Sequence, residues 1–341
     1  MNTMPLVRIH GPDDLRIDTV ERPVPGPDDV LVRVERCGIC GSDLSYAKLG
    51  GIPGAARPFA LGHEFCGVVA EVGANVTHVR AGDRVVVNPE AGGNGIGSSG
   101  LTGAFAPWIV YRDAAAHPEG LLRLPPELDF DLGALVEPFS VGMHAVNQGQ
   151  IGAGTKVVVF GAGPVGLAAA VGARYQGAND VIVVDLSEPR LAVARQLGLR
   201  TFRADAGELR DFLIEHHGDA VSDTAPGTFP ATEVFIEATG VGAVFQQACD
   251  LARKGARIVV VGVHFAPVEL NMINLLVKEL VITAAIQYPV EFPAVMDMLA
   301  SGTVDVRPLI SHHFPLSRFD EAFAQAKRQG EALKVLVDCQ R

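Results

Sequence analysis

Short runs of apolar, β-branched residues separated by turn residues fill the first third of the chain. Three such runs, at 30–35, 67–72 and 84–87, have the length and composition of strands. Turn-forming residues flank them, for example at 25–28 and 81–83. Short strands joined by irregular loops predict a mostly-β, barrel-like domain with few helices.

The pattern changes near residue 150, where wholly apolar runs begin to alternate with stretches of helical length. Helices are predicted at 164–176 and 188–197. Strands are predicted at 156–160, 181–185, 234–237, 257–263 and 280–286. Apolar runs without period-two alternation are typical of parallel strands covered on both faces. The second part of the chain is therefore predicted to be an α/β, doubly wound parallel sheet.

The last part of the chain is too short to form a core of its own. It contains two predicted helices, at 294–302 and 319–329, and a predicted strand at 335–337. We therefore expect a first domain of 1–148 completed by 288–341, and a second domain of 149–287. Within the second, the Ser-, Thr-, Gly- and Pro-rich segment 219–230 predicts a surface loop or an insertion.

A glycine-rich turn opens the second domain. It follows an apolar strand, opens a helix and has the form G-x-G-x-x-G: Gly161, Ala162, Gly163, Pro164, Val165, Gly166. The first glycine permits a tight turn, the second lets the backbone approach a pyrophosphate, and the third allows close helix–strand packing. The amino end of the helix offers free N–H donors to the phosphates. The turn therefore predicts a dinucleotide site.

Two charged residues bear on the choice of dinucleotide. Asp185 ends the next predicted strand, where it can accept hydrogen bonds from a ribose and repel a 2′-phosphate. This favours NAD over NADP. Arg190 follows shortly after, and it is either a partner for such a phosphate or a solvated helix charge.

The first domain carries a different set of chemically distinctive residues, Cys40, His63, Glu64 and Glu137. Thiolate, imidazole and carboxylate groups suit zinc, and three or four of them with an exchangeable position define a catalytic site. The alternatives are that Cys37 and Cys40 are core thiols or a redox pair, and that His63 is a core histidine. We take Cys37 as a core thiol and the other four residues as a metal site.

The segment 62–76 (GHEFCGVVAEVGANV) resembles the zinc signature of the medium-chain dehydrogenase/reductase superfamily. The Glu137-Pro138 step is similar to its polyol (sorbitol-like) and threonine dehydrogenase branches. The resemblance implies a GroES-like catalytic domain, a Rossmann domain, and hydride transfer between an alcohol and NAD. It also implies that Cys40 and His63 bind zinc, and that Glu64 and Glu137 bind it directly, through water or alternately.

The same resemblance implies roles for residues that bind substrate and cofactor. Ser42 is placed to take the alcohol proton, and Tyr46 and Phe105 to face the substrate. Four residues are expected near the nicotinamide half of the cofactor: Thr239, Gly240, Val263 and Gln287.

Two departures from the family pattern matter. Residues 88–103 contain no cysteine, so we expect no structural zinc and one zinc per chain. Relatives of the polyol type often have a histidine where this chain has Ser45, which leaves the exit route of the proton open.

Charge and composition exclude several other classes. The net charge is −11, from 28 basic and 39 acidic residues, and it disfavours nucleic acid and anionic lipid as partners. We expect no signal peptide, and no apolar run reaches membrane-spanning length. The five cysteines are too few and odd in number for a disulfide framework, so we expect a reducing cytoplasm. The apolar run 280–286 resembles the family's dimer-forming edge and predicts a homodimer or homotetramer.

Three functional hypotheses remain. The first is a zinc- and NAD-dependent dehydrogenase of polyols or secondary alcohols, working in either direction. The second is a threonine-dehydrogenase-like oxidation of an amino alcohol. The third, from a different class, is a non-catalytic NAD-binding sensor or structural protein. Zinc content and turnover discriminate the third hypothesis from the first two.

Overall fold

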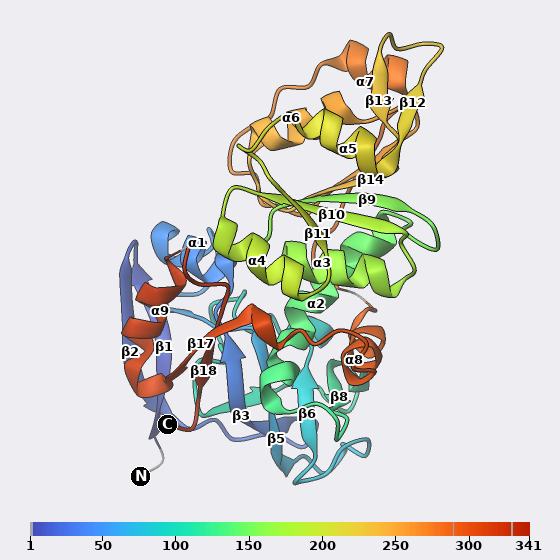
Figure 1. Ribbon diagram of the computed structural model, residues 1–341. Helices are drawn as coiled ribbons and strands as arrows, with labels where there is room; N and C mark the ends of the chain where they lie inside the picture. The colour runs from blue at the N-terminus through green and yellow to red at the C-terminus, as the bar shows by residue number, and fades with distance from the viewer. Residues whose placement is uncertain (1–2, 289, 329) are drawn as a thin grey trace. The chain divides into compact units, whose positions relative to one another are not determined.

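The computed structural model describes residues 3–288, 290–328 and 330–341, and it divides the chain into two compact units (Figure 1). The first comprises Met1–Glu137, Phe292–Gly302 and Leu309–Arg341, and the second Pro138–Glu291 and Thr303–Pro308. Helix α2 (Phe130–Gln148) continues from the first unit into the second, with Pro138 inside it. The limits expected from the sequence, 148 and 288, stay our prediction of the functional domains.

The first unit is mostly β-structure. In the described part of the chain its largest sheet has the order β17-β18-β3-β5-β6-β8, with β7 also paired to β3, and a smaller sheet has the order β2-β1-β4. The strands are β1 (Thr3–Gly11), β2 (Asp14–Glu21), β3 (Val30–Gly38), β4 (Phe59–Ala60), β5 (Glu64–Val72), β6 (Arg84–Val87), β7 (Trp108–Tyr111), β8 (Leu121–Arg123), β17 (Ile310–Pro315) and β18 (Lys334–Asp338). The expected strands at 30–35, 67–72 and 84–87 are present, and the first two are longer than expected.

The end of the chain packs into this unit through strand pairing. Strand β18 pairs antiparallel with β3, so that the red end of the chain lies beside a blue strand in Figure 1. The helices of the unit are α1 (Gly41–Leu49), the first part of α2, α8 (Phe292–Ala300) and α9 (Phe319–Ala326), and the 3-10 turns include Ala91–Gly93 and Pro118–Gly120. The expected helix at 319–329 ends earlier, and residue 329 lies outside the described residues.

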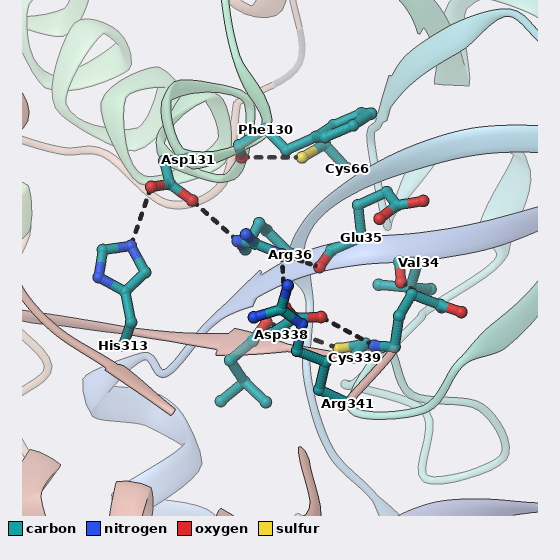
Figure 2. Close-up of polar contacts among 12 residues, drawn as sticks. Val34, Glu35, Arg36, Cys66, Phe130, Asp131, His313, Asp338, Cys339 and Arg341 are labelled. Carbon is teal, nitrogen blue, oxygen red and sulfur yellow. Dashed lines mark hydrogen bonds and ion pairs between the residues drawn. The ribbon is translucent and has the colours of Figure 1, made fainter. Parts of the chain in front are cut away.

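A network of hydrogen bonds and ion pairs connects the start of α2 to the sheet, as Figure 2 shows. The Nε of Arg36 on β3 donates to Asp131 of α2 at 2.8 Å, and its Nη1 lies 3.3 Å from Asp338 of β18. The other oxygen of Asp131 lies 2.9 Å from Nε2 of His313 on β17. Hydrogen bonds between charged groups are stronger than neutral ones. This network therefore holds in place the helix that carries Glu137.

The second unit is built on a parallel sheet with the order β11-β10-β9-β14-β15-β16. Its strands are β9 (Lys156–Phe160), β10 (Asp180–Asp185), β11 (Arg200–Arg203), β14 (Val234–Glu237), β15 (Arg257–Val260) and β16 (Val281–Ala284). Helices α3 (Pro164–Tyr175) and α4 (Glu188–Gln196) cover one face, and α5 (Leu209–His217) and α6 (Gly242–Leu251) cover the other (Figure 1). The order reverses at β9, and a crevice at that switch point is where doubly wound sheets bind ligands.

The sequence-based predictions were incomplete at several places. The segment 219–230 is not a plain loop, because β12 (Asp219–Val221) and β13 (Thr228–Pro230) form an antiparallel hairpin. Helices α1, α2, α5, α6 and α7 (Met272–Lys278) were not predicted. Strands β15 and β16 are shorter than the apolar runs from which they were predicted. None of the described helices is both long and apolar enough to cross a membrane.

Candidate active site

Sheet register assembles the candidate metal ligands. Strand β3 ends at Gly38, which pairs with Glu64 at the start of β5. The chain after β3 turns into α1, and Cys40 is the residue immediately before that helix. The ligand atoms of Cys40, His63 and Glu64 consequently lie within 4.8 Å of one another, the only such group of three or more His, Cys, Asp and Glu among the described residues.

Asp43 orients two members of this group. Its Oδ2 accepts a hydrogen bond from the backbone N–H of Cys40 at 2.9 Å, and its Oδ1 lies 3.6 Å from Nδ1 of His63. Asp43 is fully buried, and burial raises the pKa of its carboxyl. Burial by itself lowers the pKa of His63, but Asp43, Cys40 and Glu137 outweigh it and raise that pKa well above its ordinary value. The negative groups around His63 thus favour positive charge at this position.

This donor set fits a zinc ion. A thiol, an imidazole and a carboxylate converge, and they are the ligand types of catalytic zinc sites. The Oδ1 of Asp43 is buried without a hydrogen-bond partner and faces Nδ1 of His63. A carboxylate behind a metal-bound imidazole commonly fixes its orientation and tautomer. The other ring nitrogen of His63 is then the one available to a metal.

Glu137 does not join the three converging ligands. It is buried on α2 and is absent from the group within 4.8 Å. Its negative charge nevertheless contributes to raising the pKa of both His63 and Lys334, so it lies in the same electrostatic environment. Its direct binding to zinc stays a prediction.

The residues expected to contact substrate take different positions. The Oγ of Ser42 lies 3.5 Å from Nε2 of His63, and Tyr46 is near the Ser42 hydroxyl. The ring of Tyr46 packs edge-on against Phe59, with centroids 5.5 Å apart. Phe105 is wholly buried, with its ring 4.7 Å from that of Phe319. The structure therefore gives Phe105 a core position, and its contact with substrate stays a prediction.

The Ser45 hydroxyl does not point to Ser42 as a partner for proton transfer, because it is bonded within its own helix. Its Oγ donates to the carbonyl of Gly41 one turn earlier in α1, at 3.2 Å. The Ser42 hydroxyl has Tyr46 as its neighbour instead.

The glycine-rich turn of the second unit has the conformation that the fingerprint requires. Gly161 has φ of 104°, a left-handed value that glycine adopts without strain. A Cβ on Gly166 would stand 2.0 Å from the carbonyl oxygen of Gly161, so only glycine fits there. Gly163 caps α3, whose first turn contains Pro164 and Val165. The amino end of α3 therefore follows directly on the carboxyl end of β9.

Asp185 and Arg190 flank this turn. The carboxylate of Asp185, at the end of β10, accepts hydrogen bonds from the N–H groups of Ala162 and Ser187, both at 2.7 Å. A carboxylate has about four lone-pair sites, so further donors can still bind. Arg190 is partly buried rather than fully solvated, which lowers its pKa, and its Nε has no hydrogen-bond partner. A Cβ on Gly163 would stand 3.9 Å from its Nη1.

The loops after β14 and β15 are held together by a buried acid that the sequence analysis missed. Glu237 ends β14 and accepts hydrogen bonds from the N–H groups of Thr239, at 2.7 Å, and Gly240, at 3.0 Å. Its second oxygen lies 2.8 Å from Nε2 of His264. A Cβ on Gly240 would stand 2.5 Å from the carbonyl oxygen of Val263. Thr239, Gly240 and Val263, which were predicted to bind the cofactor, are therefore adjacent to one another.

Gln287 is more remote from this cluster in sequence. It is exposed, follows the last strand of the sheet, β16, and has φ of 61°. The residues of the predicted dinucleotide site thus all belong to the second unit, whereas the candidate zinc residues all belong to the first.

A buried lysine beside the candidate zinc site was also missed. Nζ of Lys334 lies 2.6 and 2.5 Å from the two carboxylate oxygens of Glu64 and donates to the carbonyl of Ile39 at 3.1 Å. No local pattern predicts this contact, because 270 residues separate the two partners. The one indication in the sequence that Lys334 is buried was its position within an apolar strand near the end of the chain.

Comparison with known proteins agrees with this geometry. Residues 26–120 match the alcohol dehydrogenase GroES-like domain family, and residues 164–301 match the zinc-binding dehydrogenase family. The rat sorbitol dehydrogenase is 36% identical over 97% of this chain and 94% of that protein. The human sorbitol dehydrogenase is 35% identical over 99% of this chain and 96% of that protein.

Solved structures give the same result. The 2R,3R-butanediol dehydrogenase of Bacillus subtilis aligns with a TM-score of 0.86 and 30% identity, covering 98% of this chain and 99% of that one. A zinc-binding dehydrogenase of Sinorhizobium meliloti, bound to NADP, aligns with a TM-score of 0.83 and 28% identity, covering 99% and 100%. The predicted fold class is confirmed: a GroES-like domain and a Rossmann sheet. The chain belongs to the zinc-dependent alcohol dehydrogenases of the medium-chain dehydrogenase/reductase superfamily, and it is an oxidoreductase.

Proposed function

We propose that the protein transfers a hydride between a polyol or secondary alcohol, or the corresponding ketone, and NAD, with one catalytic zinc per chain. The observation that carries this proposal is the convergence of Cys40, His63 and Glu64. The relatives named sorbitol dehydrogenase and the butanediol dehydrogenase of similar fold support the substrate class.

Each residue of the site has a definite task in this reaction. Cys40 and His63 would hold the zinc, and Glu64 and Glu137 would bind it in exchange with substrate. The ion supplies Lewis-acid polarisation of the substrate oxygen when it is bound. Asp43 keeps the His63 ring oriented, and Ser42 accepts the proton of the alcohol. Tyr46 lies near Ser42 and would take over the proton relay that a histidine at position 45 serves in relatives.

The preference for NAD over NADP rests on Asp185. Its carboxylate stands at the end of β10, beside the glycine-rich turn, where a 2′-phosphate would meet a negative charge. Arg190 lies nearby and would bind the phosphates or the ribose side of the cofactor.

A single zinc is supported by the composition of residues 88–103. The segment has no cysteine. Instead, Oγ of Ser98 donates to Glu90 at 2.7 Å, and the amide of Asn94 donates to the carbonyls of Ala91 and Arg112. Hydrogen bonds would therefore hold the conformation of this segment, as a structural zinc does in relatives.

Oligomer formation would use the free edge of the Rossmann sheet. Strand β16 is the last in the sheet order, and Ile282 and Ile286 are exposed there, 37% and 81% respectively. A second copy of the chain would cover this apolar edge. The five cysteines are all described and all free thiols, which supports a reducing cytoplasm.

The experiment that tests the proposal measures zinc content and turnover on one preparation. We expect one zinc per chain and NADH formation with polyols or secondary alcohols. Turnover of threonine alone would favour the amino-alcohol hypothesis. A chain that binds NAD but takes up no zinc, even after reconstitution, would establish the sensor or structural hypothesis instead.

A further inference from the structure

The ion pair between Lys334 and Glu64 is the most deeply buried one described in the first unit. Their side chains are 2% and 1% exposed, and all three acceptors of Lys334 lie within 3.1 Å of Nζ. Removing two charges from water is costly, and their attraction often does no more than offset that cost. Two apolar side chains of the same volume would fill the space without this desolvation cost. A contribution to stability is therefore a weak explanation for the ion pair.

The surrounding backbone leaves room specifically for this pair. A Cβ on Gly38 would stand 2.2 Å from Oε2 of Glu64 and 3.2 Å from Cδ of Lys334. Gly38 pairs with Glu64 on one side and with Leu336, two residues after Lys334, on the other. Any larger residue at this register position would displace the Glu64 carboxylate from the lysine.

Lys334 also lies against the candidate zinc site. Its Nζ contacts both carboxylate oxygens of Glu64 and the backbone carbonyl of Ile39, the residue before Cys40. The amino group of Lys334 therefore stands directly beside the residues that would hold a dication. Both would draw on the same carboxylate, since each Glu64 oxygen already accepts from Nζ.

We propose that Lys334 is a positioning residue that competes with zinc for the Glu64 carboxylate, and so keeps Glu64 an exchangeable ligand. This inference rests on the proposed function, since it presumes the zinc site. With Lys334 in place, binding of Glu64 to the metal would weaken its bonding to Nζ. A coordination position would then be open to substrate whenever Glu64 is bonded to Nζ instead. Without Lys334, Glu64 would remain on the metal.

The test is a double-variant cycle of Lys334→Met and Glu64→Gln, measured by chelator competition for zinc and by the visible spectrum of the cobalt(II)-substituted protein. In Lys334→Met we expect zinc to bind at least about tenfold more tightly, because a cation and a competitor are both removed. The cobalt d–d bands should shift, because an additional oxygen stays bound. In the Glu64→Gln background, Lys334→Met should leave the cobalt spectrum unchanged and tighten zinc binding by less than in the wild-type background.

Lys278→Met is the matched control. Lys278 is also a buried lysine, but in the second unit, where it donates to the carbonyls of Cys249 and Asp250 at 3.0 and 2.8 Å. Its replacement should lower stability without altering the cobalt spectrum. Lys334→Arg should retain most of the wild-type spectrum, because it keeps the charge.

Gly38→Ala provides a second route if Lys334→Met does not fold. Its added Cβ would move Glu64 off the lysine while both charges remain, and zinc should again bind more tightly. Unchanged zinc affinity and an unchanged cobalt spectrum in whichever variant folds would overturn the proposal. The proposal would also be overturned if Lys334→Met changed zinc affinity equally in the wild-type and Glu64→Gln backgrounds. A wild-type protein that binds no zinc would instead overturn the proposed function itself.

Discussion

Replacing Asp185 by serine should change which dinucleotide the protein uses. In the structure this carboxylate is the negative charge at the end of β10, next to the turn that would hold the pyrophosphate. A unit charge about 4 Å from a phosphate charge, at an effective dielectric constant of about 20, costs about 4 kcal/mol. Screening by solvent and salt reduces this, since Asp185 is not fully buried. We therefore expect the preference for NAD over NADP to fall about 100-fold, which corresponds to about 3 kcal/mol.

The substitution has a second, separable effect. Asp185 also accepts hydrogen bonds from the N–H groups of Ala162 and Ser187, which join the glycine-rich turn to the start of α4. A hydrogen bond to a charged group contributes about 1.5–3 kcal/mol. The serine variant should therefore also unfold at lower temperature and bind NAD more weakly. Asp185→Asn is the matched control, because it removes the charge but keeps the size and one acceptor oxygen.

The assay is kcat/KM for NAD and for NADP with one alcohol substrate, together with the melting temperature. The asparagine variant should lose most of the cofactor preference and less of the stability. If both variants keep the wild-type ratio of kcat/KM values, the charge of Asp185 does not select the cofactor, and Arg190 or another group must do so.

Three further predictions follow from single residues. Cys40→Ser should abolish zinc binding and turnover while NAD binding, measured by titration of the folded protein, survives; full activity would refute the metal assignment. Burial lowers the pKa of His217 to about 4, so its neutral form stabilises the fold above pH 6.5, and this contribution is lost as the pH falls from about 6.5 to 4. His217→Gln should flatten that part of the stability–pH curve in denaturant titrations, and an unaltered curve would contradict the assignment. Ile282→Lys on β16 should shift the oligomer towards monomers in analytical ultracentrifugation, unless the sheet edge is not the interface.

Local sequence was sufficient for much of the second unit. Strands β9 and β14 begin and end where the apolar runs do, because strands buried on both faces must be apolar throughout. The glycine-rich turn could be assigned because only glycine tolerates the φ of Gly161 and the close approach at Gly166. Helix α2 escaped prediction, since Gly133 and Pro138 interrupt its pattern while packing and the Arg36–Asp131 network hold it.

The sequence by itself determined the chemistry available to this protein, namely a thiol, an imidazole and carboxylates in one domain and a phosphate-binding turn in the other. These features are local, because each depends on residue type and on neighbours along the chain. The tertiary structure decided which of them meet. Cys40, His63 and Glu64 converge through the register of β3 with β5, whereas Glu137 stays outside the group. Lys334 reaches Glu64 because β18 returns beside β3. An ion pair between residues 270 positions apart leaves no trace in the local sequence pattern.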